Sequence, residues 1–167
     1  MNTYQFSTPL TDQDISQLRV GDTVYFSGLI YTARDLGHLR IADMLKSGEP
    51  LPVDFQGSIV FHAGPVAIQT EHGWEISVIG PTTSIRMEPY ATMVGQLGVK
   101  AIIGKGGMAE DSLKAYGQYG QAYLQAPPGC AVKLAAAIKG VRAVHWLDMG
   151  MPEALWELEA EGFGPLV

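Results

Sequence analysis

The sequence predicts an α/β protein, a mixed β-sheet with helices packed against it. Short runs of β-branched and aromatic residues dominate the first half of the chain, whereas helix-like and strand-like segments alternate in the second half. The chain has 167 residues, the size of one ordinary domain, and no linker-like stretch interrupts it. We therefore expect residues 1–167 to form a single domain.

The first half is predicted to be mainly β, after a polar lead-in over residues 1–20 in which Thr11 to Asp14 can cap a short helical turn. Strand-forming runs then alternate with turn residues, and one segment has helical spacing of its apolar residues. The predicted elements are strands over 23–27 and 29–32, a helix over 35–48, and strands over 58–62, 66–70 and 74–79, the last two joined at His72-Gly73.

The second half is predicted to alternate helices and strands, with glycines and prolines at the boundaries. In order, we expect a helix over 84–97, a buried strand over 99–103, a glycine-rich loop over 104–107, a helix over 109–116, a strand over 122–125 that is broken at Pro127–Gly129, a helix over 131–138 and a strand over 141–146.

Composition excludes several classes of function. The net charge of −6 argues against a nucleic-acid-binding protein, which needs a basic face. The single cysteine, Cys130, excludes an internal disulfide framework and a cluster or zinc site built from this chain's thiolates, and its apolar surroundings favour a buried, inert thiol. No signal-like or membrane-spanning segment is found, so we expect a cytoplasmic protein. Charged residues make up 17%, which indicates a face covered by another chain.

The first candidate site segment lies at a predicted strand-to-helix junction. Asp35 is a suitable N-cap residue there, and Arg34 would lie at the helix N-terminus, where backbone N–H groups favour an anion. A structural Arg–Asp pair beside a capped helix explains the same residues without any ligand.

The second segment is Gly80-Pro81-Thr82-Thr83-Ser84-Ile85-Arg86-Met87, a turn that leads into a predicted helix. Thr82 and Arg86 are four residues apart and should share one helix face. A hydroxyl and a guanidinium above a helix N-terminus suit a carboxylate, which arginine binds in bidentate fashion. The alternative is an ordinary capped helix with a solvated arginine.

Two further segments carry single chemical groups. The loop Gly104-Lys105-Gly106-Gly107 follows a buried strand and precedes a helix, a usual position for ligands in α/β sheets, although its spacing is not that of a P-loop. His62 ends a strand before Gly64-Pro65, where it is either a proton carrier or a satisfied structural residue. The remaining histidines, His38, His72 and His145, show no metal-ligand spacing.

Five motifs occur together in order: Gly-Leu-Ile-Tyr-Thr-Ala-Arg-Asp-x-x-His, His-Ala-Gly-Pro-Val, Gly-Pro-Thr-Thr-Ser-x-Arg-Met, Gly-Lys-Gly-Gly-Met and Gly-Met-Pro-Glu-Ala-Leu-Trp. With them the chain resembles the β subunit of the iron–sulfur hydro-lyases, the class I fumarate hydratase and L(+)-tartrate dehydratase family. The same unit forms the C-terminal domain of single-chain class I fumarases. The resemblance extends from about Val20 to Val167.

This resemblance implies a swivelling β/β/α domain and a partner α subunit, whose cysteines hold a 4Fe-4S cluster with one iron open to substrate. The expected assembly is a hetero-oligomer, α₂β₂ or another stoichiometry, that acts on a small dicarboxylate as a hydro-lyase of the tricarboxylic acid cycle type. It also implies that this chain binds no metal itself. Nucleic acid and membrane are not expected partners.

The resemblance also implies residue roles. Arg34, Arg86 and Lys105 match the family's carboxylate-binding positions, and Thr82 matches its proposed base for the α-proton, with Thr83 as the fallback. Asp35, His38 and His62 are expected to surround these groups. Ile85 stands where members of the family often carry a small residue, and we expect it to narrow or reshape the pocket.

Reversible hydration of fumarate to malate is the activity this implies. Dehydration of L(+)-tartrate is the alternative within the family, although no extra polar partner for its second hydroxyl can be named from the sequence. A dicarboxylate-binding or assembly module without activity is the alternative outside enzymes.

Overall fold

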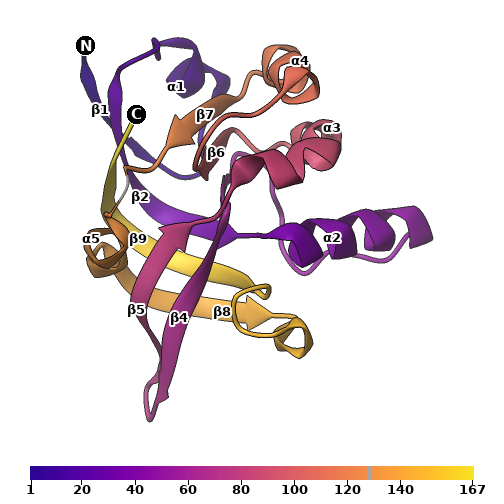
Figure 1. Ribbon diagram of the computed structural model, residues 1–167, viewed down its shortest axis with the longest axis vertical. Coiled ribbons are helices and arrows are strands. Elements are labelled where there is room, and N and C mark those ends of the chain that lie inside the picture. The colour runs from indigo at the N-terminus through magenta and orange to yellow at the C-terminus, as the bar shows by residue number, and fades with distance from the viewer. Residues whose placement is uncertain (128) are drawn as a thin grey trace.

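The computed structural model describes residues 1–127 and 129–167 and is a mixed α/β structure with 30% helix and 39% strand (Figure 1). The predicted mixed sheet with packed helices is confirmed. Its strands are β1 (Thr3–Ser7), β2 (Thr23–Thr32), β3 (Ile59–Phe61), β4 (Ala63–Thr70), β5 (Gly73–Pro81), β6 (Ala101–Gly104), β7 (Ala122–Gln125), β8 (Ile138–His145) and β9 (Leu155–Leu166).

Five α-helices and two 3₁₀ helices are present in the described part of the chain. They are α1 (Asp12–Ser16), α2 (Asp35–Ser47), η1 (Ser84–Tyr90), α3 (Ala91–Gln96), α4 (Glu110–Tyr119), α5 (Ala131–Ala136) and η2 (Leu147–Met149). Within the described residues, no helix combines the length and apolar character that crossing a bilayer requires.

The main sheet has the strand order β7-β6-β3-β2-β9-β8, with β1 also paired to β2. The pairs from β1 through β2, β3 and β6 to β7 are parallel, whereas β9 is antiparallel to both β2 and β8. Parallel strands place their carboxyl ends at one edge of a sheet. The loops after β2, β3 and β6 therefore meet at one edge.

Side chains alternate between two apolar clusters, one on each face of this sheet. Val60, Ile102 and Leu155 pack with residues of α2 and α3, such as Ile41 and Val94. Their neighbours on the same strands, Phe61, Ile103 and Trp156, point the opposite way, where they pack with Ile79 of β5 and Leu134 of α5. The layers are therefore the hairpin with α5, the main sheet, and the helices, in agreement with the β/β/α order that the resemblance implies.

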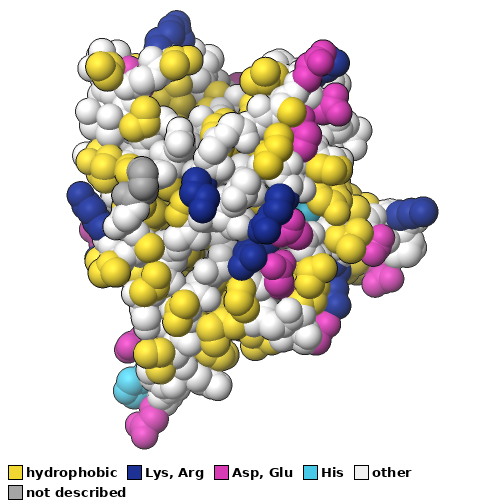
Figure 2. All heavy atoms as spheres, viewed as in Figure 1, with side chains coloured by type: hydrophobic (Ala, Val, Ile, Leu, Met, Phe, Trp, Pro, Cys, Tyr) yellow, Lys and Arg dark blue, Asp and Glu magenta, His cyan; other side chains and the backbone are white. Residues whose placement is uncertain are grey.

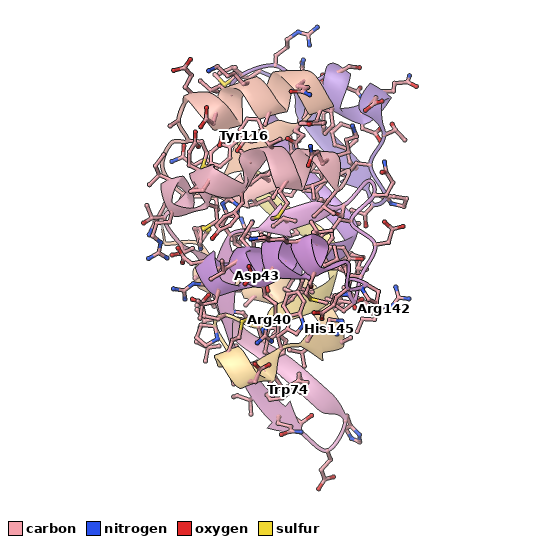
Figure 3. All side chains as sticks on the ribbon, turned by 90° about the vertical axis from the view of Figure 1, so that its right-hand side faces the viewer. Arg40, Asp43, Trp74, Tyr116, Arg142 and His145 are labelled. Atoms are coloured by element: carbon pink, nitrogen blue, oxygen red, sulfur yellow. The ribbon has the colours of Figure 1, made fainter. Side chains whose placement is uncertain are left out.

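Figure 1 shows the β4–β5 hairpin extending beyond the body of the molecule, and Figure 3 shows α4, α3 and α2 stacked over the opposite face of the sheet. The hairpin begins directly after His62 and ends at Pro81, directly before Thr82. A hydrogen bond from the Thr82 N–H to the His62 carbonyl, 2.7 Å, closes its base. The hairpin thus starts and ends at residues of the candidate site.

Several sequence predictions need correction. The lead-in over residues 1–20 contains β1, which pairs in parallel with β2, and the two runs predicted over 23–32 form one strand that continues through Gly28. The predicted helix over 84–97 is the 3₁₀ helix η1 followed by α3, with Pro89 inside η1. The predicted break at Pro127–Gly129 includes Pro128, which lies outside the described residues.

The longest strand, β9, has no counterpart among the predicted elements. It lies between β2 and β8 in the interior of the sheet, and its first four residues are buried. From Trp156 to Glu161 apolar and acidic residues alternate, which is the pattern of a half-buried strand, so this part of β9 does have a signal in the sequence. Near its end, however, β9 contains Gly162, Gly164 and Pro165. These residues are typical of turns and interrupt the strand pattern in the sequence.

Candidate functional site

The four sequence segments come together at the carboxyl edge of the parallel strands. Arg34 follows β2, His62 follows β3 and Lys105 follows β6, and these three strands are neighbours. A β-bridge joins Thr83 to Lys105, which brings the turn after β5 to the same edge. Ligands of open α/β sheets bind at this edge. In Figure 2, basic side chains gather near the middle of one molecular face with acidic side chains among them.

Arg86 links the first two segments. Its Nη2 donates a hydrogen bond to Thr82 Oγ1 at 2.7 Å and lies 3.0 Å from Asp35 Oδ2. The two side chains are thus in contact, but they do not share a helix face as expected, because Thr82 precedes the 3₁₀ helix η1. Asp35 adds a carboxylate from the start of α2. The Arg86 and Asp35 side chains are 45% and 38% exposed, so water reaches this cluster.

Arg34 has a different acidic partner. Its Nε lies 3.2 Å from Glu153 Oε1, while Glu153 Oε2 accepts a hydrogen bond from the Leu36 N–H at 3.0 Å. The Nε atom is buried and has no partner in hydrogen-bond geometry, so the contact with Glu153 is an ion pair by distance. The expected N-cap role of Asp35 is wrong: Arg34 occupies the N-cap position, Asp35 is the first helical residue, and Glu153 binds the free N–H at the helix start.

Ser84 holds the Lys105 loop in place. Its buried Oγ accepts a hydrogen bond from the Lys105 N–H at 3.1 Å and lies 2.9 Å from His62 Nδ1. Thr83 is the N-cap residue of η1, but its side chain makes no capping hydrogen bond. A Cβ on Gly104 would lie 1.8 Å from Ser84 Oγ, so a glycine is needed for this close approach.

Thr82 is partly exposed, whereas Thr83 and Lys105 are exposed. Within residues 1–127 and 129–167, no carboxylate lies within ion-pair distance of the Lys105 ammonium group. Lys105 thus adds an uncompensated positive charge beside the two arginines. Ile85 is also exposed, at the turn that carries Thr82 and Arg86.

Two buried histidines lie beneath the site, with their ring centroids 5.4 Å apart. His38 Nδ1 lies 2.8 Å from the Arg34 carbonyl oxygen, which places His38 beside Arg34 as expected. Burial lowers the pKa of His38, and burial together with the neighbouring His38 lowers the pKa of His62 well below its usual value. Both rings are therefore neutral at pH 7 and support the backbone of the site, in agreement with the structural interpretation of His62.

The free energy of unfolding is expected to fall as the pH drops below about 6.5. The reason is that His38 and His62 have lowered pKa values in the folded chain and therefore take up protons more readily in the unfolded chain. Between the lowered folded pKa and 6.5 the unfolded chain binds more protons, so each histidine contributes a slope of up to about 1.4 kcal/mol per pH unit. Urea unfolding between about pH 7.5 and 5.5 measures this.

The substitution His62→Gln, which retains a hydrogen-bonding group toward Ser84, should reduce that slope. His72→Gln, at the exposed hairpin turn, is the matched control and should leave it unchanged. A free energy of unfolding that stays constant over this range in the unmodified chain would contradict the prediction.

The described residues do not fit an iron–sulfur cluster. No group of three or more His, Cys, Asp or Glu side chains converges there in a metal-binding arrangement. Cys130 is partly buried next to α5, and burial raises the pKa of its thiol, which disfavours the thiolate that a metal requires. The part of the chain described by the structure thus offers positive charge and hydroxyl groups rather than metal ligands.

The comparison with protein families gives one match, to the family described as Fumarase C-terminus, over residues 2–167. The chain belongs to this family. The resemblance stated from the five motifs is thereby confirmed, and it covers β1 as well, which lies before the first motif.

The curated relatives of this chain carry names from the same group of enzymes, some of them provisional. A Methanocaldococcus jannaschii protein, provisionally named L(+)-tartrate dehydratase subunit beta, is 51% identical over 160 residues, which are 95% of this chain and 82% of the relative. The L(+)-tartrate dehydratase subunit beta of Escherichia coli K12 is 38% identical over 96% of this chain and 79% of its own length. A Geobacillus stearothermophilus protein provisionally named fumarate hydratase class I is 42% identical over 95% of this chain but only 30% of its own length.

Sequence reasoning missed two residues of this site, Glu153 and Ser84. Glu153 is part of the motif Gly-Met-Pro-Glu-Ala-Leu-Trp and is the only charged residue in it, a signal that could have marked it as a partner for one of the arginines. Ser84 was one of three neighbouring hydroxyls, and which of them points inward depends on the 3₁₀ geometry of η1.

Proposed function

We propose that this chain is the β subunit of an iron–sulfur hydro-lyase that interconverts fumarate and malate. The observation that supports this most directly is the convergence of Arg34, Arg86 and Lys105 at one sheet edge, beside the Thr82 hydroxyl. Three cations and the two carboxylates of Asp35 and Glu153 leave a net positive charge there. Such a site attracts a dicarboxylate dianion.

In this proposal the cations bind the two substrate carboxylates. Arginine offers paired N–H donors to a carboxylate, and Lys105 supplies a mobile point charge from its loop. When the α-proton of malate leaves, negative charge spreads into the adjacent carboxylate, and a fixed guanidinium stabilises that charge more in the transition state than in the ground state. Arg34 and Arg86 therefore bind substrate and also favour proton abstraction.

Thr82 takes the α-proton in this proposal, with Thr83 as the alternative. A threonine hydroxyl is too weak a base without activation. Arg86 donates a hydrogen bond to Thr82 Oγ1. This hydrogen bond stabilises negative charge on the oxygen and fixes the orientation of the hydroxyl group. A carboxylate from the partner chain is then needed to accept the hydroxyl proton, because Asp35 contacts Arg86 on the same nitrogen rather than Thr82.

The partner is an α subunit that holds the 4Fe-4S cluster, and departure of the substrate hydroxyl belongs to that side of the site. The lone thiol, Cys130, supports this division. A second supporting observation is the β4–β5 hairpin, where Val66, Ile68 and Val78 expose apolar side chains, as expected of a surface that another chain covers.

Dehydration of L(+)-tartrate is the second candidate, and the names of the relatives that match over most of their own length favour it. Its substrate has a second hydroxyl, for which the partly exposed Thr82 or the exposed Thr83 offers a hydrogen-bonding group. A dicarboxylate-binding module without activity is the non-enzyme alternative.

The test is anaerobic affinity purification of this chain from its own cells, identification of its partners by mass spectrometry, and assay of the complex with fumarate, malate and L(+)-tartrate. A cysteine-bearing iron–sulfur chain in about equal amount, with turnover of fumarate, is the expected result. Preferential turnover of tartrate would replace the substrate and retain the mechanism. A cluster-loaded complex that binds dicarboxylates without turnover would instead support the binding module.

A further inference from the structure

The loop over residues 150–154, which precedes β9, contacts both the β4–β5 hairpin and the start of α2. The Trp156 Nε1–H donates to the Met151 carbonyl at 2.9 Å, and the Ala67 N–H of β4 lies 3.2 Å from Met151 Sδ. On the hairpin side, a Cβ on Gly64 would lie 2.5 Å from the Pro152 carbonyl oxygen, so the two backbones are in direct contact. The loop is thus held from both sides, and Glu153 is its next residue.

Glu153 joins this loop to Arg34 with both carboxylate oxygens in use. One oxygen lies 3.2 Å from Arg34 Nε, and the other accepts the Leu36 N–H at 3.0 Å. The Arg34 and Glu153 side chains are 26% and 17% exposed, whereas the Arg86–Asp35 pair is about 40% exposed. Because water screens the less exposed Arg34–Glu153 pair less, its attraction restricts the guanidinium more strongly than that of the Arg86–Asp35 pair does.

We infer that Glu153 is the positioning residue for Arg34 in the proposed dicarboxylate site. It holds the Nε edge of the guanidinium, which leaves the Nη1 and Nη2 edge for bidentate contact with a substrate carboxylate. The motif Gly-Met-Pro-Glu-Ala-Leu-Trp then has a role in the site: its first residues anchor the loop, and its glutamate sets the orientation of an arginine 119 positions earlier in the chain. This inference rests on the proposed function for its effect on catalysis.

A purely structural role for Glu153, as the acceptor for the N-terminal N–H groups of α2, predicts a different result. The substitution Glu153→Gln separates the two roles, because the amide oxygen still accepts the Leu36 N–H while the ion pair is lost. If Glu153 only accepts the N–H at the start of α2, Glu153→Gln should have kcat/KM close to that of the wild type, or should lower kcat/KM by the same factor whether or not Arg34 is present. A positioning role makes its effect depend on Arg34.

The first test is a double-mutant cycle in the assembled complex. We expect Glu153→Gln to lower kcat/KM roughly tenfold, since a small misplacement of a substrate-orienting group costs one to two orders of magnitude. In an Arg34→Ala background the same change should lower kcat/KM less than about twofold. Glu157→Gln is the matched control, a buried glutamate of β9 whose charged partners are His145 and Arg142 rather than Arg34, and it should leave kcat/KM unchanged. Equal losses in both backgrounds, or no loss in the wild-type background, would overturn the inference.

The second test needs no activity. In the full chain labelled with ¹⁵N-arginine, the Arg34 Nε–H signal is identified by its absence in Arg34→Lys. Because this nitrogen is buried beside Glu153, we expect its signal to shift and exchange faster with water in Glu153→Gln, and to stay in place in Glu157→Gln. An unchanged signal in Glu153→Gln would overturn the positioning role. A wild-type complex without hydro-lyase activity would refute the proposed function, while this signal still decides the role of Glu153.

Discussion

Replacing Arg86 with alanine is expected to lower kcat/KM of the assembled enzyme by about 10³-fold, because one substitution removes a carboxylate ligand and the hydrogen bond to the proposed base. The Arg86 guanidinium donates to Thr82 Oγ1 and pairs with Asp35, so no other described residue stands in the same position. Its loss leaves the Thr82 oxygen without the donor that stabilises negative charge on it. Both kcat and KM should change, since Arg86 acts on substrate in the ground state and in the transition state.

The fold should survive this change, because the Arg86 side chain is 45% exposed and exposed ion pairs contribute at most about 1 kcal/mol. Arg142→Ala is the matched control. Arg142 lies on the edge strand β8, two strands away from β2, and its nearest carboxylate is Glu157 at 4.0 Å (Figure 3). We expect its turnover to equal that of the wild type. Arg86→Ala with more than about a tenth of wild-type kcat/KM would refute the role assigned to Arg86.

The substitution Gly64→Ala is expected to destabilise the chain by about 3 kcal/mol, at the upper end of the usual cost of overpacking. The new Cβ would lie 2.5 Å from the carbonyl oxygen of Pro152 and 2.8 Å from its Cα. These are backbone atoms, so no side-chain rotation relieves the clash, and either the hairpin or the loop must move. The loop carries Glu153, so we also expect weaker activity of the assembled enzyme.

Urea unfolding of the full chain measures the change in the free energy of unfolding. Gly117→Ala is the matched control, since Gly117 is exposed on α4 and a Cβ there meets nothing within 4 Å. It should stabilise the chain by about 0.5–1 kcal/mol through helix propensity alone. If Gly64→Ala unfolds at the same urea concentration as wild type, the contact between the hairpin and the Pro152 loop is not present in solution.

Part of the candidate site could be predicted from the sequence because its contacts are local. Thr82 and Arg86 are close in sequence, and the expected proximity of their side chains is present as a hydrogen bond, although Thr82 precedes the 3₁₀ helix η1 rather than lying on a helix face. The positions of Arg34, His62 and Lys105 after strands also follow from local patterns, because each comes shortly after a run of β-branched, apolar or aromatic residues. Their meeting at one edge then needs only parallel pairing of β2, β3 and β6.

The acidic partners could not be predicted in this way. Asp35 meets Arg86 across 51 positions of sequence and Glu153 meets Arg34 across 119, and an ion pair at such a separation leaves no periodic signal. The N-cap of α2 was misassigned for the same reason, since the group that binds the free helical N–H comes from the loop before β9 rather than from the adjacent Asp35.

The sequence by itself determined the family, the class of fold and the candidate residues of the site, because motifs, periodicity and turn residues are local properties. Only the tertiary structure decided which carboxylate holds which arginine, which hydroxyl points inward and where β9 lies. Those outcomes depend on strand order and on contacts between segments that are far apart in the sequence. In β9 the alternation of apolar and acidic residues from Trp156 to Glu161 is visible in the sequence, but its position between β2 and β8 is decided by the pairing of the sheet.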